Sequence, residues 1–505
     1  MTFQRDLAWQ QLDLVHRASV AHQFARYALA VDYPLLPEDV VHQAKRCILD
    51  ALGCAIGAFE APGRAIVEAT IAEVGGPAEA TVFCSGVKTS AMNAALVNSF
   101  LVRFLDYNDI GGGSHNSDAL ASILAVAERE KRSGRDFLAS LVISYELGAR
   151  FRDPVSTGVD HFSELKAKAS DAHTPSVHSG GPRQKSLEEK GWTSDIRAGL
   201  NQPAALGKLM GLDETQIANA IGICLSHTLP LGILDADREE NVMAKNIRFG
   251  WAAHDAILSC MLAKRGFTGP VRIVESDAGI RRVIAQDEMD LERLMDFSGW
   301  RIMKVKFKAM PTNATTAGHV AATIAIVKER DLKPGDIASI QIRASPRESR
   351  HTTTPAKKYP RNAESADHSA FYANALAVID REFGLNSIDP RRFTDPEVLS
   401  LIEKISVEPD PMLGAFQGIS EITTKDGRRF VKRVDVPYGL GDPLSDSELE
   451  HKFRAMALQF LDAEHVGRII DACWNVDKLD NVAELARLMV FPSGTSATVF
   501  QKGHS

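Results

Sequence analysis

The chain has few cysteines, and their spacing excludes two kinds of metal site. Six of the 505 residues are cysteine, and no two of them form a Cys-x-x-Cys pair. Iron–sulfur clusters and structural zinc ions depend on closely spaced thiolates, so neither is predicted. The cysteines lie in apolar stretches such as "AKRCILDALGCAIGAF", which is typical of buried, reduced thiols.

Long apolar runs and an excess of positive charge are also missing. No stretch of about eighteen apolar residues occurs, and the first residues lack the apolar segment of a signal peptide. Lys and Arg total 58 against 65 Asp and Glu, which gives a net charge of -7. We therefore expect a cytoplasmic protein without nucleic-acid or membrane partners. Any anionic ligand must be bound by positive charge gathered locally.

Phosphate-binding motifs and internal repeats are absent as well. The glycine-rich stretches "GAFEAPGRA" and "GGGS" lack the strand-then-helix context of a nucleotide-binding loop. The sequence thus predicts neither a P-loop enzyme nor a dinucleotide-dependent one.

Helical periodicity dominates residues 1–303 and returns in 446–505. Segments such as "LLPEDVVHQAKRCILDALGCAIGAF" and "WAAHDAILSCMLAKRGFTGP" are nearly apolar all round, as expected for buried helices of a large bundle. Pro37 suits the start of the first of these helices. Ser445 and Glu448 have the spacing of a capping box at the start of the last helical part. A polar segment at 156–190 reads as a surface excursion.

Residues 304–445 differ, because alternating patterns such as "ASIQIRAS" predict strands. Asp426-Gly427 in "EITTKDGRRFVKRVDVPYG" predicts a type I′ hairpin turn. A chain of 505 residues is longer than one hydrophobic core usually supports, so at least two domains are expected. We therefore predict a mainly α protein with a large all-α domain (1–303 and 446–505) and a smaller inserted α+β lid (304–445).

The stretch "LDYNDIGGGSHNSDALASILAVAE" concentrates polar residues before an apolar helix. Asn116 or Ser117 is a good N-cap for a helix over 119–129, which would make the helix start a cradle for a carboxylate beside His115. Asp106 ends the preceding helix one turn after Arg103, where a carboxylate needs a cationic partner or a function. The alternative is that Asp106 and Asp109 simply face solvent.

Three further clusters carry candidate cations. Lys245 and Arg248 can share a helical face, Lys304, Lys306 and Lys308 alternate along an extended segment, and His368 and Tyr372 are four residues apart on a helix. Taken singly, each cluster has an ordinary structural interpretation. The first could be two solvated cations, the second a charged edge strand, and the third a pair packed in the core. Together they place positive charge at the expected seam between the two domains, where small ligands commonly bind. A di- or tricarboxylate fits that charge.

The order of these motifs resembles the MmgE/PrpD family, from about Leu36 to Leu488. The segments that carry the resemblance include "LPEDVVHQAKRCILDALGCAIGA", "AALVNSFLVRFLDYND", "HNSDALASILAVAE", "FKAMP" and "KKYPRNAESADHSAFYANALAVI". The resemblance implies a helical domain with an α+β lid, a homodimer, and an active site that uses neither metal nor organic cofactor. It implies as catalytic candidates Asp106, His115, Lys245, Lys308 and Tyr372, and we add as substrate-binding candidates Arg103, Arg248, Ser117 and His368.

The chain departs from the family pattern at several positions. Ile110 follows the acidic motif, Asn116 replaces a proline, and Asn313 stands where decarboxylase-like members use a histidine. Gly191-Trp192-Thr193 replaces a glycine-x-histidine pattern, and Gly111–Gly113 replace bulkier residues and would enlarge the pocket.

The resemblance, together with the clustered cations, implies a cofactor-independent hydro-lyase acting on a 2-methylcitrate-like hydroxy-polycarboxylate. His115, or Asp106 acting through it, would be the base, and Tyr372 or His368 would protonate the leaving hydroxyl. Three alternatives stay open: a cis-aconitate-type decarboxylase, an epimerase of a small dicarboxylate, and a non-catalytic dimeric binding protein.

Overall fold

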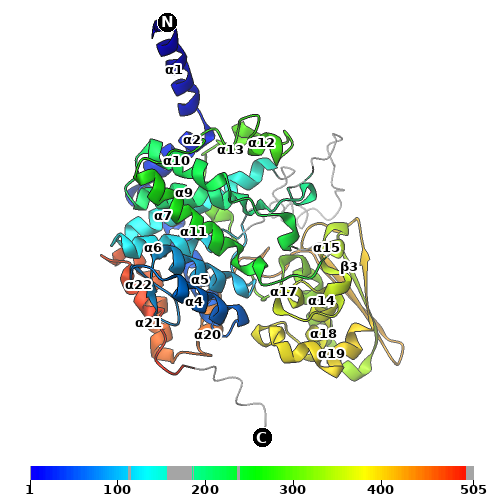
Figure 1. The fold of residues 1–505 in the computed structure, drawn as a ribbon. Helices are drawn as coiled ribbons and strands as arrows, with labels where there is room; N and C mark the ends of the chain where they lie inside the picture. Colours follow the sequence, from blue (N-terminus) through cyan, green and yellow to red (C-terminus); the bar gives the residue numbers. More distant parts are fainter. Residues whose placement is uncertain (1, 112–114, 156–184, 186, 236–238, 496–505) are drawn as a thin grey trace.

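A body of packed helices and a smaller region with a sheet make up the molecule (Figure 1). The computed structural model describes residues 2–111, 115–155, 185, 187–235 and 239–495. The protein is mainly helical, with one mixed four-stranded sheet in its C-terminal region, and this confirms the predicted fold class. Among the helices described, none is long and apolar enough to cross a membrane.

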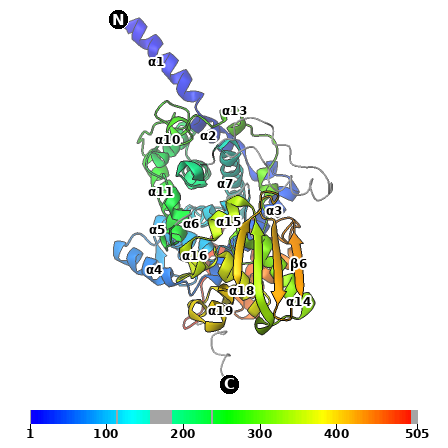
Figure 2. The same ribbon diagram turned by 90° about the vertical axis from the view of Figure 1, so that its right-hand side faces the viewer.

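The helical body is built mostly from the first 300 residues. Its longer helices are α1 (Thr2–Arg17), α2 (Val20–Ala30), α3 (Glu38–Gly57), α4 (Pro62–Val74), α5 (Ala91–Phe104), α6 (Leu120–Arg129), α7 (Gly134–Val155), α9 (Ala198–Leu209), α10 (Glu214–Leu225) and α11 (Ala244–Lys264). Two short helices, α12 (Ile280–Val283) and α13 (Leu291–Leu294), follow, and β1 (Ala80–Thr81) pairs with β2 (Lys88–Thr89). Helix α1 projects away from the rest in both views (Figures 1 and 2).

Helices α5 and α11 pack closely because a glycine lies at their contact. A Cβ atom on Gly250 of α11 would lie 2.6 Å from the main-chain oxygen of Leu96 on α5, so only glycine permits this approach. The contact matters for the site, because α5 carries Arg103 and α11 carries Lys245.

The C-terminal region folds around a sheet with the strand order β4-β3-β5-β6 (Figure 2). The strands are β3 (Ile337–Ala344), β4 (Ile405–Pro409), β5 (Gly418–Thr424) and β6 (Arg429–Val434), and only the β3–β4 pair is parallel. The region's helices are α14 (Ala317–Arg330), α15 (Pro346–Thr352), α16 (Pro355–Lys358), α17 (Ala363–Ala366), α18 (Ala370–Ile379) and α19 (Pro396–Ile402). Helix α14 packs against β5 and β6.

The predicted hairpin forms, but the predicted turn type is wrong. Strands β5 and β6 pair antiparallel from Gly418↔Val434 to Thr423↔Arg429. A type I′ turn needs positive φ at both central residues, whereas φ is positive at Gly427 (85°) and not at Asp426. Four residues connect the strands, and the Gly427 N–H donates to the Thr424 carbonyl.

The chain then returns to the helical body through α20 (Asp446–Ala457), α21 (Ala463–Trp474) and α22 (Ala483–Leu488). One apolar core holds residues between Val20 and Phe307 together with residues between Leu444 and Phe491, and a second core lies between Val320 and Ile422. The first core also takes in Val305, Phe307 and Leu444, which lie inside the predicted lid, so the division at 304 and 445 stays a prediction.

Local predictions have mixed outcomes. The capping box at Ser445 and Glu448 is confirmed, Pro37 stands at the N-cap position of α3 without a side-chain cap, and all six cysteines are buried and free. Most of the predicted excursion at 156–190 lies outside the described residues.

Candidate active site

Asp106 is the centre of a buried charged cluster. It follows the end of α5 with a left-handed backbone (φ 45°), which is strained for a residue other than glycine. Its Oδ1 accepts hydrogen bonds from Arg103 Nη1 and Lys308 Nζ, both at 2.7 Å, and its main-chain oxygen lies 2.6 Å from the same Lys308 nitrogen. These cations stabilise both the carboxylate and the strained turn.

The other oxygen of Asp106 faces residues from both regions. Lys245 Nζ, from α11, lies 3.7 Å from Oδ2, and His368 Nε2 lies 3.8 Å from it. Lys245 also lies 3.3 Å from Asp367 Oδ2, and Asp367 Oδ1 contacts His368 Nδ1. The structure therefore brings together five of the predicted site residues with Asp367, which was not predicted: Arg103, Asp106, Lys245, Lys308 and His368.

His115 completes the cluster on the side of Oδ1. Its Nε2 lies 3.5 Å from Asp106 Oδ1, and its Nδ1 lies 2.6 Å from the Asp109 carbonyl oxygen. A carbonyl oxygen only accepts, so Nδ1 carries the hydrogen. Arg197 Nη2 donates to the His115 carbonyl at 2.8 Å and fixes the backbone there.

The start of the helix after His115 was predicted to bind a ligand's carboxylate, but the structure places a carboxylate of the chain itself there. A 3-10 turn over Asn116–Ala119 precedes α6, and neither Asn116 nor Ser117 caps that helix. The Ser117 hydroxyl donates to Asp109 Oδ1 at 2.6 Å, and Tyr145 donates to Oδ2 at 2.6 Å. The helix start thus holds the chain's own Asp109, which also overturns the alternative that Asp109 faces solvent.

Two other candidates lie apart from Asp106. Arg248 pairs with Asp195 at 2.7 Å and with Asp235 at 2.5 Å. The Tyr372 hydroxyl donates to the Ser387 carbonyl at 2.6 Å inside the second core. His368 precedes the α18 N-cap, so the two residues do not share a helical face as predicted.

Two further expectations are wrong, one about the three lysines and one about Gly111. Lys304 ends a 3-10 turn (Arg301–Lys304), so the three lysines do not alternate along one strand. A Cβ atom on Gly111 would lie 2.8 Å from Val305 Cγ2, so this glycine admits a neighbouring side chain rather than enlarging a pocket. Gly112 and Gly113 lie outside the described residues.

Burial and neighbouring charges set the protonation of the cluster. Burial alone would raise the pKa of Asp106, but Arg103, Lys308 and Lys245 hold it well below its usual range. Burial lowers the pKa of Lys308, partly offset by Asp106. Burial raises the pKa of Asp367 to about 7. Three cations, Arg103, Lys245 and Lys308, thus face the ionised Asp106 and Asp367, whose pKa is about 7. The positive charges outnumber the negative ones, so the cluster could balance the charge of an anionic ligand.

Both histidines of the cluster are neutral at pH 7. Burial lowers the pKa of His115 well below its usual range, and Arg103 and Lys308 lower it further. Burial lowers the pKa of His368 well below its usual range, and Lys245 lowers it further. A neutral imidazole in such a site can accept a proton.

Donor atoms of Asp106, Asp367 and His368 lie within 4.8 Å of one another, a spacing that a metal ion could use. However, Arg103 and Lys308 already occupy Oδ1 of Asp106, and Lys245 faces Oδ2 and Asp367. A cation added here would be repelled, so the residues do not fit a metal site.

Several contributors were missed by reasoning from sequence. Asp367 adjoins His368, and that adjacency was a usable signal. Tyr145 and Lys452 gave none, because their contacts join distant segments. Lys452 Nζ donates to Asp50 Oδ1 and to the Tyr107 carbonyl, both at 2.7 Å, so α20 supports the turn that carries Asp106.

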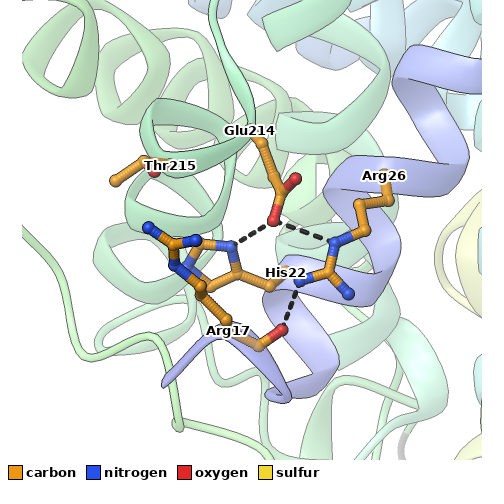
Figure 3. A pocket seen from close by; sticks show the side chains of 5 residues that line it. All are labelled: Arg17, His22, Arg26, Glu214 and Thr215. Atoms are coloured by element: carbon orange, nitrogen blue, oxygen red, sulfur yellow. Dashed lines mark hydrogen bonds and ion pairs between the residues drawn. The ribbon is translucent and has the colours of Figure 1, made fainter. Parts of the chain in front are cut away.

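A further cavity lies elsewhere in the helical body. It measures about 340 Å³ between α2 and α10 and is lined by Arg17, His22, Arg26, Glu214 and Thr215, and its Glu214 accepts from His22 and Arg26 (Figure 3). A cavity of about 10 Å³ adjoins His115, lined also by Asp118, Arg197 and Phe249.

A helical body, a smaller α+β region and a buried, cation-rich cluster between them define a two-region protein with its polar site at the seam. The chain belongs to the MmgE/PrpD family: the family's N-terminal domain matches residues 22–164 and 183–292, and its C-terminal domain matches 310–476.

Individual relatives are similar over most of the chain. Cis-aconitate decarboxylase of Mus musculus is 26% identical over 94% of each chain, and that of Homo sapiens is 25% identical over 94% of this chain and 95% of its own. Mitochondrial 2-methylcitrate dehydratase of Yarrowia lipolytica is 24% identical over 81% of this chain and 78% of its own.

Proposed function

We propose that this protein is a cofactor-independent hydro-lyase that dehydrates a 2-methylcitrate-like hydroxy-polycarboxylate. The observation that carries the proposal is the Asp106 cluster, in which three buried cations and two neutral imidazoles surround one ionised carboxylate. Relatives named as acting on cis-aconitate and 2-methylcitrate support a polycarboxylate substrate.

The cations supply the electrostatic part of the chemistry. Removing a proton next to a carboxylate builds negative charge on a group that is already anionic. Lys245, Lys308 and Arg103 lie where such charge would be stabilised without reorganisation of solvent. Removing one such fixed donor costs about 100-fold to 1,000-fold in turnover in comparable sites.

The proton path is assigned from hydrogen bonds. His115 carries its hydrogen on Nδ1, so Nε2 takes the proton from the substrate carbon. The electron pair of that C–H bond forms the double bond as the C–O bond breaks. The leaving hydroxyl takes a proton from Lys308 and departs as water. Asp106 Oδ1 faces both groups, at 3.5 Å from His115 and 2.7 Å from Lys308, and can return the proton from the imidazolium to the amine.

This assignment replaces the acid expected from sequence. The Tyr372 hydroxyl is committed to the Ser387 carbonyl. Lys308 has a pKa lowered by burial, which suits it to give up a proton.

A citrate-sized ligand does not fit the cavity of about 10 Å³ beside His115. We expect such a ligand to enter through a motion that opens the site, such as a parting of the α+β region from the helical body. Such closure motions exclude water from many active sites.

Decarboxylation of a cis-aconitate-like acid is the second candidate. The two mammalian relatives, both named cis-aconitate decarboxylase, favour it, and loss of carbon dioxide would use the same cations. The presence of a base and an acid on one carboxylate oxygen favours elimination of water.

One experiment separates these reactions. Purified protein is incubated with 2-methylcitrate, citrate, isocitrate and cis-aconitate while alkene absorbance, carbon dioxide and product chirality are followed. Alkene formation from a hydroxy acid without carbon dioxide supports the proposal. Carbon dioxide from cis-aconitate establishes the second candidate instead, and inversion at an acidic carbon without an alkene shows epimerisation.

A further inference from the structure

The amide of Asn313 has a fixed orientation. Asn313 precedes the 3-10 turn Ala314–Thr316, and its Oδ1 accepts from the Thr315 N–H at 3.0 Å and from the Thr315 hydroxyl at 2.6 Å. A main-chain N–H only donates, so this end of the amide must be the oxygen. The NH₂ end therefore points the other way, into the Asp106 cluster.

That NH₂ group lies 2.7 Å from His368 Nε2 and 3.5 Å from Asp106 Oδ2. An amide NH₂ only donates, so Nε2 of His368 carries no hydrogen. The other ring nitrogen, Nδ1, faces the carboxylate of Asp367 and carries it. Both nitrogens of His368 are thus engaged.

His115 shows the opposite situation at the same carboxylate. It too has its hydrogen on Nδ1, which donates to Asp109. However, no donor among the described residues hydrogen-bonds its Nε2, which faces Asp106 Oδ1. The two imidazoles differ at Nε2, where an amide donates to His368 and none from the part of the chain that the structure describes donates to His115.

We propose that Asn313 is a positioning residue that fixes His368 as a neutral Nδ1–H imidazole with an occupied Nε2, and so withdraws it from proton transfer. His115 is then the one imidazole of the cluster able to accept the substrate's proton. The second statement rests on the proposed function, and the first does not.

The charges around His368 act in the same direction. Lys245 from α11 lies 3.5 Å from Nδ1, and Lys357 of α16 and His351 of α15 also face the ring. These groups disfavour an imidazolium, whereas Asp106 and Asp367 favour one. Protonation at Nε2 would in addition place two donors against each other, because Thr315 prevents the amide from turning.

The experiment is nitrogen-15 NMR of the ring nitrogens of the full chain, with the His368 signal assigned from a His368→Gln spectrum. We expect the Nδ1–H form of His368 in the native protein from pH 6 to 8. An Nε2–H form or an imidazolium in that range overturns the proposal.

Asn313→Asp gives the sharper arm. A carboxylate at that position accepts a hydrogen bond, so His368 should change to Nε2–H or to the imidazolium. An unchanged His368 signal in a folded variant, checked by circular dichroism, also overturns the proposal.

Asn374→Asp is the matched control. Asn374 Nδ2 faces His319 Nδ1 at 2.8 Å in the C-terminal region, so it holds that ring in the opposite, Nε2–H form. The control should alter His319 and leave His368 unchanged.

A kinetic measurement covers the part that depends on function. If an acid is turned over, the acidic limb of the kcat/KM pH profile should persist in His368→Gln and vanish in His115→Gln. Persistence in His115→Gln overturns the assignment of His115. If no acid is turned over, the proposed function fails while the NMR result still decides the role of Asn313.

Discussion

Asp106→Asn tests how far the buried cations depend on one carboxylate. The substitution keeps size and shape but removes the charge that Arg103 and Lys308 contact at 2.7 Å. The new NH₂ group would also face Lys245 at 3.7 Å. Removing one partner from a buried ion pair costs about 3–5 kcal/mol. We expect the upper part of that range because Arg103 and Lys308 lose the carboxylate together. Lys245 also loses it and, within the described ranges, keeps only Asp367 as an ion-pair partner.

Asp331→Asn is a matched control for backbone and chemistry. Asp331 also has a left-handed φ, 49° against 45° for Asp106. Its side chain is 74% exposed and pairs with Arg381 and Lys333 at the surface. Exposed pairs contribute about 0–1 kcal/mol, so this variant should unfold almost as the native protein does.

The assay is urea unfolding at pH 7.5 followed by circular dichroism, with the free energy of unfolding extrapolated to water. A loss for Asp106→Asn no greater than that for Asp331→Asn would refute the reasoning, because the cations would then not need the carboxylate.

Further predictions concern packing, pH and metal dependence. Gly318→Ala should lower the free energy of unfolding by about 3 kcal/mol, because its Cβ would lie 2.3 Å from the Phe416 carbonyl oxygen. Gly467→Ala, which has open space on α21, should raise it by about 1 kcal/mol. Urea unfolding of both variants measures these changes. Burial raises the pKa of Asp367 to about 7, so ionising it costs stability above pH 7 and that cost disappears as the pH falls. The melting temperature of Asp367→Asn relative to the native protein should therefore rise between pH 5 and pH 8, and a constant difference would contradict this. Turnover should be unchanged by a chelator such as EDTA, and a loss restored by added metal would contradict the assignment of the cluster.

The sequence was sufficient for the architecture because periodicity reports burial. Helical spacing identified α3 and α11, and alternation identified β3, β5 and β6. Alternation did not predict the turn type at Asp426, because that depends on the hydrogen bonds that the four connecting residues make with the ends of β5 and β6. Nor did helical spacing give the start of α6, because Ser117 contacts Asp109 instead of capping the helix.

The candidate site could be predicted only in part. Asp106, His115, Lys245 and Lys308 were proposed because the family resemblance implies them, and Asp106, His115 and Lys245 also stand close to the ends of helical segments. The predicted shared face of His368 and Tyr372 was wrong because a spacing of four residues does not reveal where a helix begins. The role of Asn313 depends on a contact with Thr315 that fixes its amide, and no pattern in the sequence encodes that orientation.

The central claim is that His115 Nε2 removes a proton from an anionic substrate held by the Asp106 cluster. Its most direct test is kcat/KM of His115→Gln on the acid that the native protein turns over, with both proteins shown to melt at similar temperatures. The account predicts a loss of about 100-fold to 10,000-fold, the contribution of a positioned general base. Turnover within about threefold of the native protein would contradict it.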